Sequence, residues 1–212
     1  MSLSLSDARL YAILDMGYVD EQNATAVTRT LLAGGAGVLQ IRAKRWGRER
    51  ISSMAERILP LTRDAGVPLI INDYPEVAAE VDADGVHIGQ DDGSIEEIRY
   101  IVGDEMIVGR STHTVAQAKQ ALKEGFDYIG FGPVFPTPTK AGRPGIGLDN
   151  IAKAQVEVGE KIPMFCIGGI KVENLSEVVT AGAQRVVIVS GLLQADNIEA
   201  ACKAVIVGMD DI

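Results

Sequence analysis

Cysteine, histidine and aromatic residues are scarce in this sequence. Its 212 residues include two cysteines and two histidines, and aromatic residues make up 5% of the chain. Cys166 and Cys202 have neither the spacing of metal ligands nor the pattern of a disulfide framework, and Cys166 lies in an apolar run typical of a strand core. These features argue against a disulfide-stapled secreted domain and favour a reduced, cytoplasmic protein.

Long apolar runs and an excess of basic residues are also lacking. No apolar run has the length of a membrane span, and the first residues, MSLSLSDARL, lack the basic and apolar regions of a secretory signal. The net charge is −9, which argues against binding to nucleic acid or to an acidic membrane, because both attract basic faces. We therefore expect small-molecule ligands, and an anionic ligand would need a local cluster of cations.

Short apolar runs alternate with segments of helical period along the whole chain. The runs begin at Tyr11, Gly37, Val67, Asp84, Met106, Tyr128, Pro163 and Arg185. Between them lie amphipathic stretches such as residues 24–35, 48–66, 114–125 and 174–183, several of which end on the glycine expected just past a helix. Apolar strands joined by helices predict a parallel sheet covered on both faces. The pattern predicts an α/β fold, a single (β/α)8 TIM barrel domain over residues 1–212, with an open doubly wound sheet as the alternative.

Polar residues gather at the carboxyl ends of the predicted strands, where barrel enzymes carry their active sites. The first strand ends at Asp15 and the second carries Gln40, Arg42 and Lys44. The following ends supply Asn72, Asp73, His87, Gln90, Asp91, Asp92, Arg110, Ser111, Thr112, His113, Gly168, Gly169, Ser190 and Gly191. This distribution predicts a polar pocket at one mouth of the barrel.

Cations and carboxylates at this mouth suit a metal-bridged polyphosphate. Arg42, Lys44 and Lys140 would meet phosphate oxygens, for which arginine is the natural bidentate partner. Asp73 and Asp92 are hard oxygen ligands at neighbouring strand ends, and Mg²⁺ is usually held by a few carboxylates together with substrate phosphates. Taken singly, Lys44 could belong to a solvated basic turn and Asp92 could be a helix N-cap.

Glycine-rich strand ends predict a second anion site. The stretches IGGI, at 167–170, and VSG, at 189–191, each precede a probable helix, where backbone N–H groups can approach a phosphate. The alternative is that Gly168 and Gly169 only form a tight turn. Two anion sites at one mouth would fit two phosphorylated substrates, or a single substrate with two phosphate groups.

Residues 130–148, GFGPVFPTPTKAGRPGIGL, concentrate proline and glycine after the sixth predicted strand. Such a mixture builds a specified shape more often than a flexible one, because proline fixes φ and glycine reaches conformations closed to other residues. We interpret the segment as a lid over the mouth, with a long surface turn as the alternative.

Seven ordered stretches carry a resemblance to thiamine-phosphate synthases. They are QIRAK at 40, IND at 71, ADGVHIGQDD at 83, GRSTHT at 109, DYIGFGPVFPTPTK at 127, IGGI at 167 and VIVSG at 187. The resemblance runs from Tyr11 to about Ala201. It implies a TIM-barrel transferase that joins 4-amino-5-hydroxymethyl-2-methylpyrimidine diphosphate to 4-methyl-5-(2-phosphoethyl)thiazole, releasing pyrophosphate and forming thiamine phosphate with Mg²⁺. A homodimer is also expected for such barrels.

The resemblance also implies roles for individual residues. The pyrimidine diphosphate would be bound by Gln40, Arg42, Lys44, Asn72, Ser111 and Lys140. The thiazole phosphate would be held by Thr137, Thr139, Gly169, Val189 and Ser190. Asp73 and Asp92 would hold Mg²⁺. Lys140, Ser111 and Arg42 are the predicted catalytic residues, since they would stabilise the departing pyrophosphate, and no protein nucleophile is required.

Two other functions stay open at this point. Thiazole tautomerases resemble the synthases in fold but typically carry a histidine just after the glycine of the sixth strand, where this chain has Pro133. A non-catalytic barrel that binds a phosphorylated ligand is the other alternative. His87 is expected to be a hydrogen-bonded residue of the barrel core, whereas His113 is expected to line the pocket and Trp46 to pack near the mouth.

Overall fold

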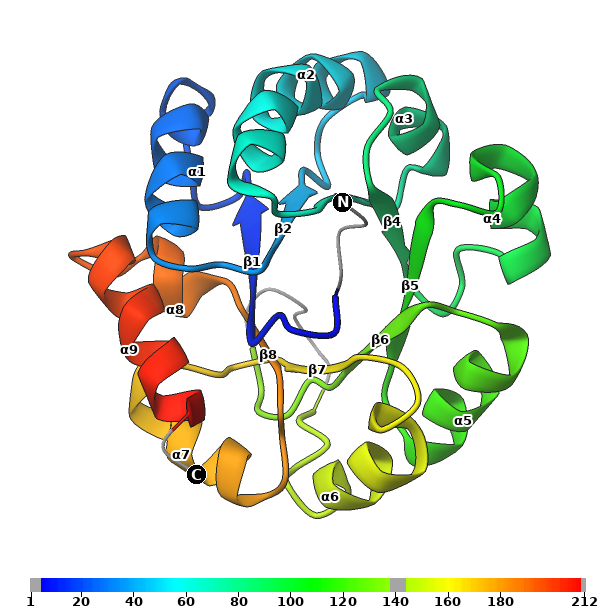
Figure 1. The fold of residues 1–212 in the computed structure, drawn as a ribbon, viewed down its shortest axis with the longest axis vertical. Coiled ribbons are helices and arrows are strands. Elements are labelled where there is room, and N and C mark those ends of the chain that lie inside the picture. Colours follow the sequence, from blue (N-terminus) through cyan, green and yellow to red (C-terminus); the bar gives the residue numbers. More distant parts are fainter. Residues whose placement is uncertain (1–4, 138–143, 211–212) are drawn as a thin grey trace.

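The protein forms a closed barrel of parallel strands surrounded by helices (Figure 1). The computed structural model describes residues 5–137 and 144–210. The strands follow one another around the barrel in sequence order, from β1 through β8 and back to β1. They are β1 (Leu10–Asp15), β2 (Val38–Arg42), β3 (Leu69–Asn72), β4 (Gly85–Ile88), β5 (Ile107–Thr112), β6 (Tyr128–Phe131), β7 (Met164–Ile167) and β8 (Val186–Ile188). The predicted TIM barrel is confirmed, and the open sheet is wrong because β1 pairs with β8.

Helices cover the outside of the barrel, and every strand is followed along the chain by at least one of them. They are α1 (Ala24–Ala33), α2 (Arg48–Ala65), α3 (Pro75–Glu80), α4 (Ile95–Val102), α5 (Val115–Glu124), α6 (Ile151–Ala154), α7 (Leu175–Thr180), α8 (Ser190–Leu193) and α9 (Ile198–Asp210). Short turns of other helix types precede α1 (Glu21–Asn23), follow α6 (Gln155–Gly159) and precede α7 (Val172–Asn174). Helices α2 and α5 end at Gly66 and Gly125, whose φ angles of 68° and 91° are left-handed, as the sequence pattern predicts.

The first turn of α4 settles one alternative left open by the sequence. Ser94 is the N-cap: its side chain accepts a hydrogen bond from the Glu97 amide at 3.2 Å, and Glu97 accepts one from the Ser94 amide at 2.8 Å. This reciprocal pair is a capping box. Asp92 therefore is not the N-cap of α4, and its carboxylate has a different role.

Alternate residues of each strand face opposite sides of the barrel wall. In β1, Leu10, Ala12 and Leu14 belong to the apolar layer between strands and helices. Tyr11 and Ile13 belong to a second cluster inside the barrel, which also contains Val38, Ile70, Tyr128, Phe165 and Val187. The period of two follows from strand geometry. It decides which residues of a strand face the interior of the barrel.

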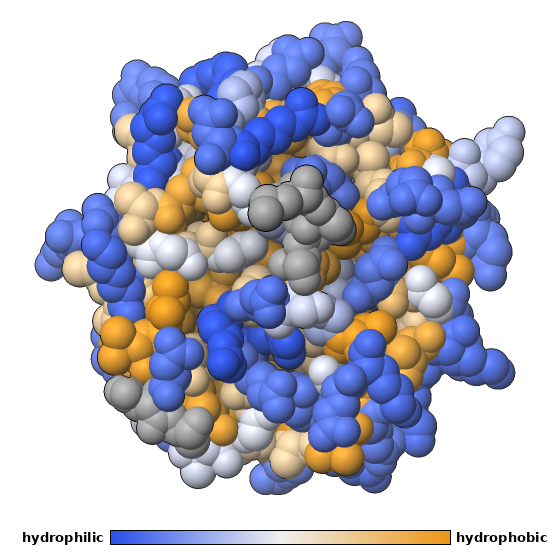
Figure 2. Space-filling view, viewed as in Figure 1, coloured by the Kyte–Doolittle hydropathy of each residue, from blue (hydrophilic) through white to orange (hydrophobic). Residues whose placement is uncertain are grey.

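The N-terminal segment covers one end of the barrel interior. Leu5 and Ala8 are buried and join the interior cluster with Tyr11 and Val38. Figure 1 shows this segment crossing the centre of the barrel, and Figure 2 shows hydrophilic side chains over much of the surrounding surface of that face. Because the strands are parallel and this segment precedes β1, it covers the amino ends of the strands. The pocket therefore opens at the opposite end.

Within the described residues, no helix combines the length and the apolar character needed to cross a membrane.

Candidate active site

An open pocket occupies the carboxyl-terminal mouth of the barrel, and its wall is built largely from the inward-facing strand residues. Each strand contributes at least one of them. The lining includes Tyr11, Ile13, Gln40, Arg42, Asn72, His87, Ser111, Tyr128, Gly130, Phe165, Ile167 and Val187. Loops after the strands add His113, Pro133, Thr137, Gly168, Gly169, Ile170, Val189 and Ser190. The prediction that polar strand ends share one mouth is confirmed for this set.

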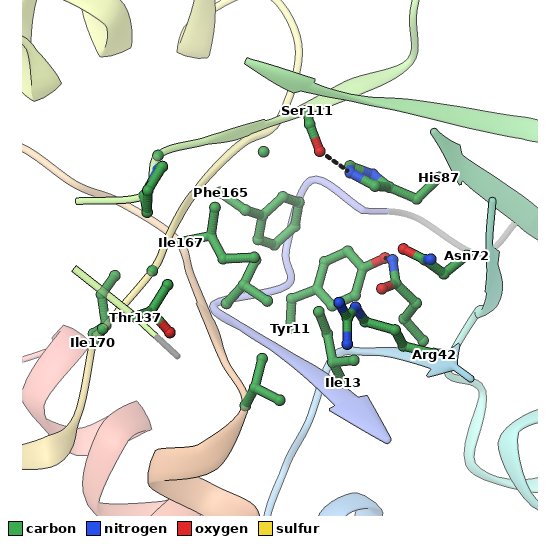
Figure 3. Close-up of a pocket in the computed structure, with 18 of the residues that line it drawn as sticks. Tyr11, Ile13, Arg42, Asn72, His87, Ser111, Thr137, Phe165, Ile167 and Ile170 are labelled. Carbon is green, nitrogen blue, oxygen red and sulfur yellow. Dashed lines mark hydrogen bonds between the residues drawn. The ribbon is translucent and has the colours of Figure 1, made fainter. Parts of the chain in front are cut away.

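A chain of side-chain hydrogen bonds crosses the floor of the pocket. Gln40 Nε2 donates to the Tyr11 hydroxyl at 2.8 Å, and the hydroxyls of Tyr11 and Tyr128 lie 3.0 Å apart. The Tyr128 hydroxyl lies 3.0 Å from His87 Nδ1, and His87 Nε2 lies 3.0 Å from Ser111 Oγ. Figure 3 shows the last of these bonds, with His87 and Ser111 reaching toward each other from neighbouring strands. The polar floor is thus one connected network of residues from β1, β2, β4, β5 and β6.

Aromatic packing holds the two tyrosines of this network in place. The ring of Phe165 meets those of Tyr11 and Tyr128 edge to face, with centroids 5.2 and 5.9 Å away. Burial raises the pKa of both tyrosines well above the ordinary range. Both hydroxyls therefore keep their protons at physiological pH and can act as hydrogen-bond donors.

Arg42 lies at the mouth in an ion pair with Asp15. The two residues are register partners on β1 and β2, and Arg42 Nη1 contacts Asp15 Oδ2. The other oxygen of Asp15 accepts a hydrogen bond from the Gly17 amide at 2.9 Å. The Asp15 side chain is 4% exposed and that of Arg42 is 14% exposed. The pair fixes the guanidinium in the pocket wall.

The two predicted metal ligands lie on the rim and do not line the pocket itself. Asp73 follows β3, and its Oδ2 is 2.6 Å from the ammonium nitrogen of Lys44. Asp92 follows β4, and its Oδ2 accepts a hydrogen bond from the Gly89 amide at 2.7 Å. Asp73 has a φ of 66°, an uncommon left-handed conformation for a residue other than glycine. Lys44 and Asp73 are therefore already joined in an ion pair, and none of Lys44, Asp73 and Asp92 is among the residues that line the pocket.

Close contact between the loops after β6 and β7 shapes the opposite side of the pocket. The amides of Val134 and Phe135 donate to the carbonyls of Ile167 and Gly168 at 2.8 and 3.0 Å. A Cβ at Gly168 would lie 2.4 Å from Pro133, and its φ of 104° is left-handed, so only glycine fits there. These contacts place Thr137 beside Ile170, across the pocket from Arg42 and Asn72 (Figure 3).

The structure brings most of the predicted site residues to one pocket. Those that line it are Gln40, Arg42, Asn72, Ser111, Thr137, Gly169, Val189 and Ser190. Thr139 and Lys140 lie outside the residues that the structure describes. Their predicted roles stay predictions, as does a lid function for the whole of residues 130–148.

Three side chains of the site were absent from the sequence-based set or were placed differently. Tyr11 and Tyr128 were interpreted only as parts of apolar runs, yet their hydroxyls form the centre of the pocket floor. His87 has the expected hydrogen bonds, but its placement in the packed core was wrong, because it lines the pocket. The sequence does contain a signal that could have found these side chains, namely the period of two along each strand. By that period, Tyr11, Gln40, His87 and Tyr128 all occupy inward positions.

The structure agrees with the predictions for His113 and Cys166 and with a packing role for Trp46. His113 lines the pocket, and its Nδ1 contacts the Gly132 carbonyl oxygen. Trp46 packs against the core, with the Arg50 guanidinium 3.8 Å from the centre of its ring. Cys166 is fully buried in β7, and burial raises the pKa of its thiol to about 12. Neither Trp46 nor Cys166 belongs to the pocket.

The fold and the pocket together are those of a (β/α)8-barrel enzyme, whose polar site lies at the carboxyl ends of the strands. The profile of the thiamine monophosphate synthase family matches residues 10–192, and the chain belongs to that family.

Relatives and a solved structure support this membership along nearly the full chain. The chain is 48% identical to a thiamine-phosphate synthase of Thermus thermophilus over 177 residues, which cover 84% of each protein. It is 38% identical to a thiamine-phosphate synthase of Shouchella clausii over 206 residues, covering 96% of this chain and 97% of that one. The solved thiamine phosphate pyrophosphorylase from Pyrococcus furiosus superposes with a TM-score of 0.88 at 31% identity, and 98% of each chain is covered.

Proposed function

We propose that the protein is a thiamine-phosphate synthase. It joins 4-amino-5-hydroxymethyl-2-methylpyrimidine diphosphate to 4-methyl-5-(2-phosphoethyl)thiazole, and the products are thiamine phosphate and pyrophosphate. The observation that carries the proposal is the family match over residues 10–192, together with a pocket lined by the corresponding strand-end residues. A pocket with polar groups on two sides suits two phosphorylated substrates.

Arg42, Asn72 and Ser111 bind the pyrimidine diphosphate in this proposal. Arg42 offers a guanidinium already oriented by Asp15, and such a fork matches phosphate oxygens with two parallel hydrogen bonds. The Asn72 amide and the Ser111 hydroxyl add neutral donors in the same pocket. Gln40 contributes from the floor and Lys44 from the rim. Lys140 completes the set as predicted from the sequence.

Asp73 and Asp92 are the proposed ligands of Mg²⁺. Within residues 5–137 and 144–210, no group of three or more carboxylate, histidine or cysteine side chains could hold a metal. A pair of carboxylates on the rim fits Mg²⁺, because this ion takes one or two carboxylates and completes its shell with water and substrate phosphates. When bound, the ion would neutralise charge on the diphosphate.

Thr137, Gly169, Val189 and Ser190 are the proposed site for the thiazole phosphate, together with Thr139. Thr137 and Ile170 lie across the pocket from Arg42 and Asn72 (Figure 3), so the two substrates would meet between these two sides. Ile167 and Ile170 provide an apolar wall on the same side. This arrangement would place the thiazole nitrogen toward the carbon that loses pyrophosphate.

The chain's own residues then have three tasks in the reaction. Arg42, Ser111 and Lys140 stabilise the negative charge that grows on the departing pyrophosphate, which is where preorganised donors contribute most. The apolar wall and the loop after β6 exclude water, which would otherwise capture the cationic pyrimidine. The bond from carbon to the diphosphate oxygen breaks, and the bond from that carbon to the thiazole nitrogen forms.

A product assay with a matched variant tests the proposal. Purified protein is incubated with both substrates and Mg²⁺, and thiamine phosphate and pyrophosphate are quantified. Arg42→Met should lower kcat/KM about 100-fold or more, as loss of one transition-state donor does elsewhere. Arg63→Met, which removes an exposed cation paired with Asp82, is the control and should match the wild type.

Each alternative function has its own outcome in the same assay. Thiazole isomerisation without thiamine phosphate would favour a tautomerase, and ligand binding without turnover would favour a non-catalytic barrel. Pro133 lies in the described structure at the position where tautomerases typically carry a histidine. A cytoplasmic location and a homodimer stay predictions from the sequence.

A further inference from the structure

The direction of each hydrogen bond in the pocket floor follows from the donors available. Gln40 Nε2 can only donate, so the Tyr11 oxygen accepts from it. The single proton of Tyr11 must then point to the Tyr128 oxygen, the other partner in this network. By the same count, the proton of Tyr128 points to His87 Nδ1. His87 Nδ1 is therefore an acceptor.

An imidazole that accepts at Nδ1 carries its proton at Nε2. His87 Nε2 lies 3.0 Å from Ser111 Oγ, so the ring donates to the serine oxygen. The serine oxygen thus has a lone pair engaged by His87, which leaves its proton for an acceptor other than the imidazole. The carbonyl of Ser111 accepts a hydrogen bond from Gln90 Nε2, which fixes the backbone of the same residue.

We propose that His87 and Tyr128 are positioning residues that hold Ser111 as a hydrogen-bond donor aimed at the substrate. This inference rests on the proposed function, in which Ser111 stabilises the departing pyrophosphate. His87 does not accept a proton from Ser111 in this arrangement, and Ser111 is not a nucleophile. The floor network instead sets one orientation of the serine hydroxyl before the substrate arrives.

The surroundings of the network support a fixed orientation. Tyr11 and Tyr128 are 2% and 1% exposed, and Phe165 packs on both rings. A Cβ at Gly109, the residue beside His87 and Tyr128 in the strand register, would lie 2.1 Å from the Tyr128 ring. The glycine therefore makes the room in which the Tyr128 hydroxyl reaches His87. Burial also raises the pKa of both tyrosines, which keeps them as proton donors.

The tautomer of His87 is the first test, and it needs no substrate. Long-range ¹H–¹⁵N correlation spectra of the resting protein show which ring nitrogen carries the proton, and the chain has two histidines, so His87→Gln assigns the signals. We expect the Nε2–H tautomer in the wild type. A proton on Nδ1 would overturn the proposal, because it would reverse the network and make the ring an acceptor from Ser111.

Two hydroxyl deletions in the same core separate the link to His87 from general packing. Tyr128→Phe removes the donor to Nδ1 and should give a mixture of tautomers. Tyr11→Phe removes a hydroxyl one link further away and should keep the Nε2–H form, because Tyr128 still donates to His87. Equal spectra for Tyr128→Phe and wild type would contradict the proposal.

A double-mutant cycle links the network to catalysis. Tyr128→Phe should lower kcat about tenfold, with a smaller change in KM, which corresponds to the loss of one neutral hydrogen bond in the transition state. In a Ser111→Ala background the same change should have almost no further effect. Additive effects would show that Tyr128 acts by another route and would sink the proposal. Absence of thiamine phosphate from the wild type would instead refute the proposed function, while the tautomer result would still decide the orientation of His87.

Discussion

The ammonium nitrogen of Lys44 lies 2.6 Å from Oδ2 of Asp73, so this carboxylate is paired with a cation of the same chain. Lys44 follows β2 and Asp73 follows β3, and these strands are hydrogen-bonded neighbours. In the proposed reaction the two residues have different partners, since Asp73 holds Mg²⁺ and Lys44 meets the diphosphate. Binding of the metal with its substrate would therefore exchange one ion pair for two new contacts.

This exchange predicts an effect of Lys44 on metal binding in the absence of substrate. Lys44→Met removes the competing cation, so divalent metal should bind more tightly, by up to about fivefold for a pair of this exposure. Mn²⁺ binding followed by electron paramagnetic resonance measures the change. Lys203→Met, which removes the cation of the exposed pair with Glu199, is the matched control. Equal Mn²⁺ affinity in the wild type and in Lys44→Met would contradict the prediction.

The buried pair of Asp15 and Arg42 predicts a loss of stability together with a loss of substrate affinity. Asp15→Asn keeps an oxygen for the Gly17 amide but removes the charge that faces Arg42. We expect the free energy of unfolding to fall by about 3 kcal/mol, because removing one charge of a buried ion pair leaves the other charge less well compensated. Urea unfolding measures this loss, and the KM for the pyrimidine diphosphate should rise.

Asp82→Asn is the control for the effect of Asp15. Asp82 pairs with Arg63 at 2.8 Å, but its side chain is 90% exposed. Asparagine tolerates the left-handed φ of 54° found there. This variant should lose less than about 1 kcal/mol. A loss for Asp82→Asn equal to that for Asp15→Asn would show that burial of the pair is not the cause.

The barrel could be predicted from the sequence because its signals are local. Each strand lies in a short run rich in apolar residues, and helices α2 and α5 end on Gly66 and Gly125 as the pattern indicates. The polar residues toward the carboxyl ends of the strands follow from the same reasoning, since these ends of parallel strands meet at one mouth. Gln40, Arg42, Asn72 and Ser111 were found in this way, and all line the pocket.

The pairing of these residues could not be predicted, because it depends on register and rotamer. Asp15 and Arg42 contact each other since they are register partners, and no local pattern gives that register. Tyr11 and Tyr128 were missed for a different reason. The strands were interpreted as uniformly apolar, whereas the inward positions carry hydroxyl, amide and imidazole groups at a period of two.

Gly109 offers a test of the space around Tyr128. In Gly109→Ala the new methyl group would lie 2.1 Å from the tyrosine ring, so the ring must move and its bonds to His87 and Tyr11 would lengthen or break. We expect a loss of about 1–3 kcal/mol in the free energy of unfolding, as for other overpacked cores, and a lower kcat.

Gly130 is the matched control for Gly109, because it is also an inward glycine of a strand and lines the same pocket. A Cβ there would meet its nearest neighbour, the His87 ring, at 3.6 Å, an ordinary contact. Gly130→Ala should therefore keep the stability of the wild type within about 0.5 kcal/mol. The idea fails if both variants unfold at the same urea concentration.

The buried tyrosines predict a loss of stability at alkaline pH. Burial raises the pKa of Tyr11 in the folded protein above its ordinary value, so above a pH of about 10 the unfolded chain releases a proton that the folded chain retains. The unfolded state then binds fewer protons, and the free energy of unfolding falls by about 1.4 kcal/mol per pH unit for each such tyrosine. Below that pH both states are protonated, and the full stability is present.

Tyr11→Phe should make the slope between about pH 10 and 11.5 shallower by roughly this amount, as measured by urea unfolding at several pH values. Tyr100→Phe, at a ring that is 93% exposed, is the control and should keep the wild-type slope. If Tyr11→Phe had the same slope as this control, the Tyr11 hydroxyl would ionise in the folded protein as readily as in the unfolded chain, and the prediction would be wrong.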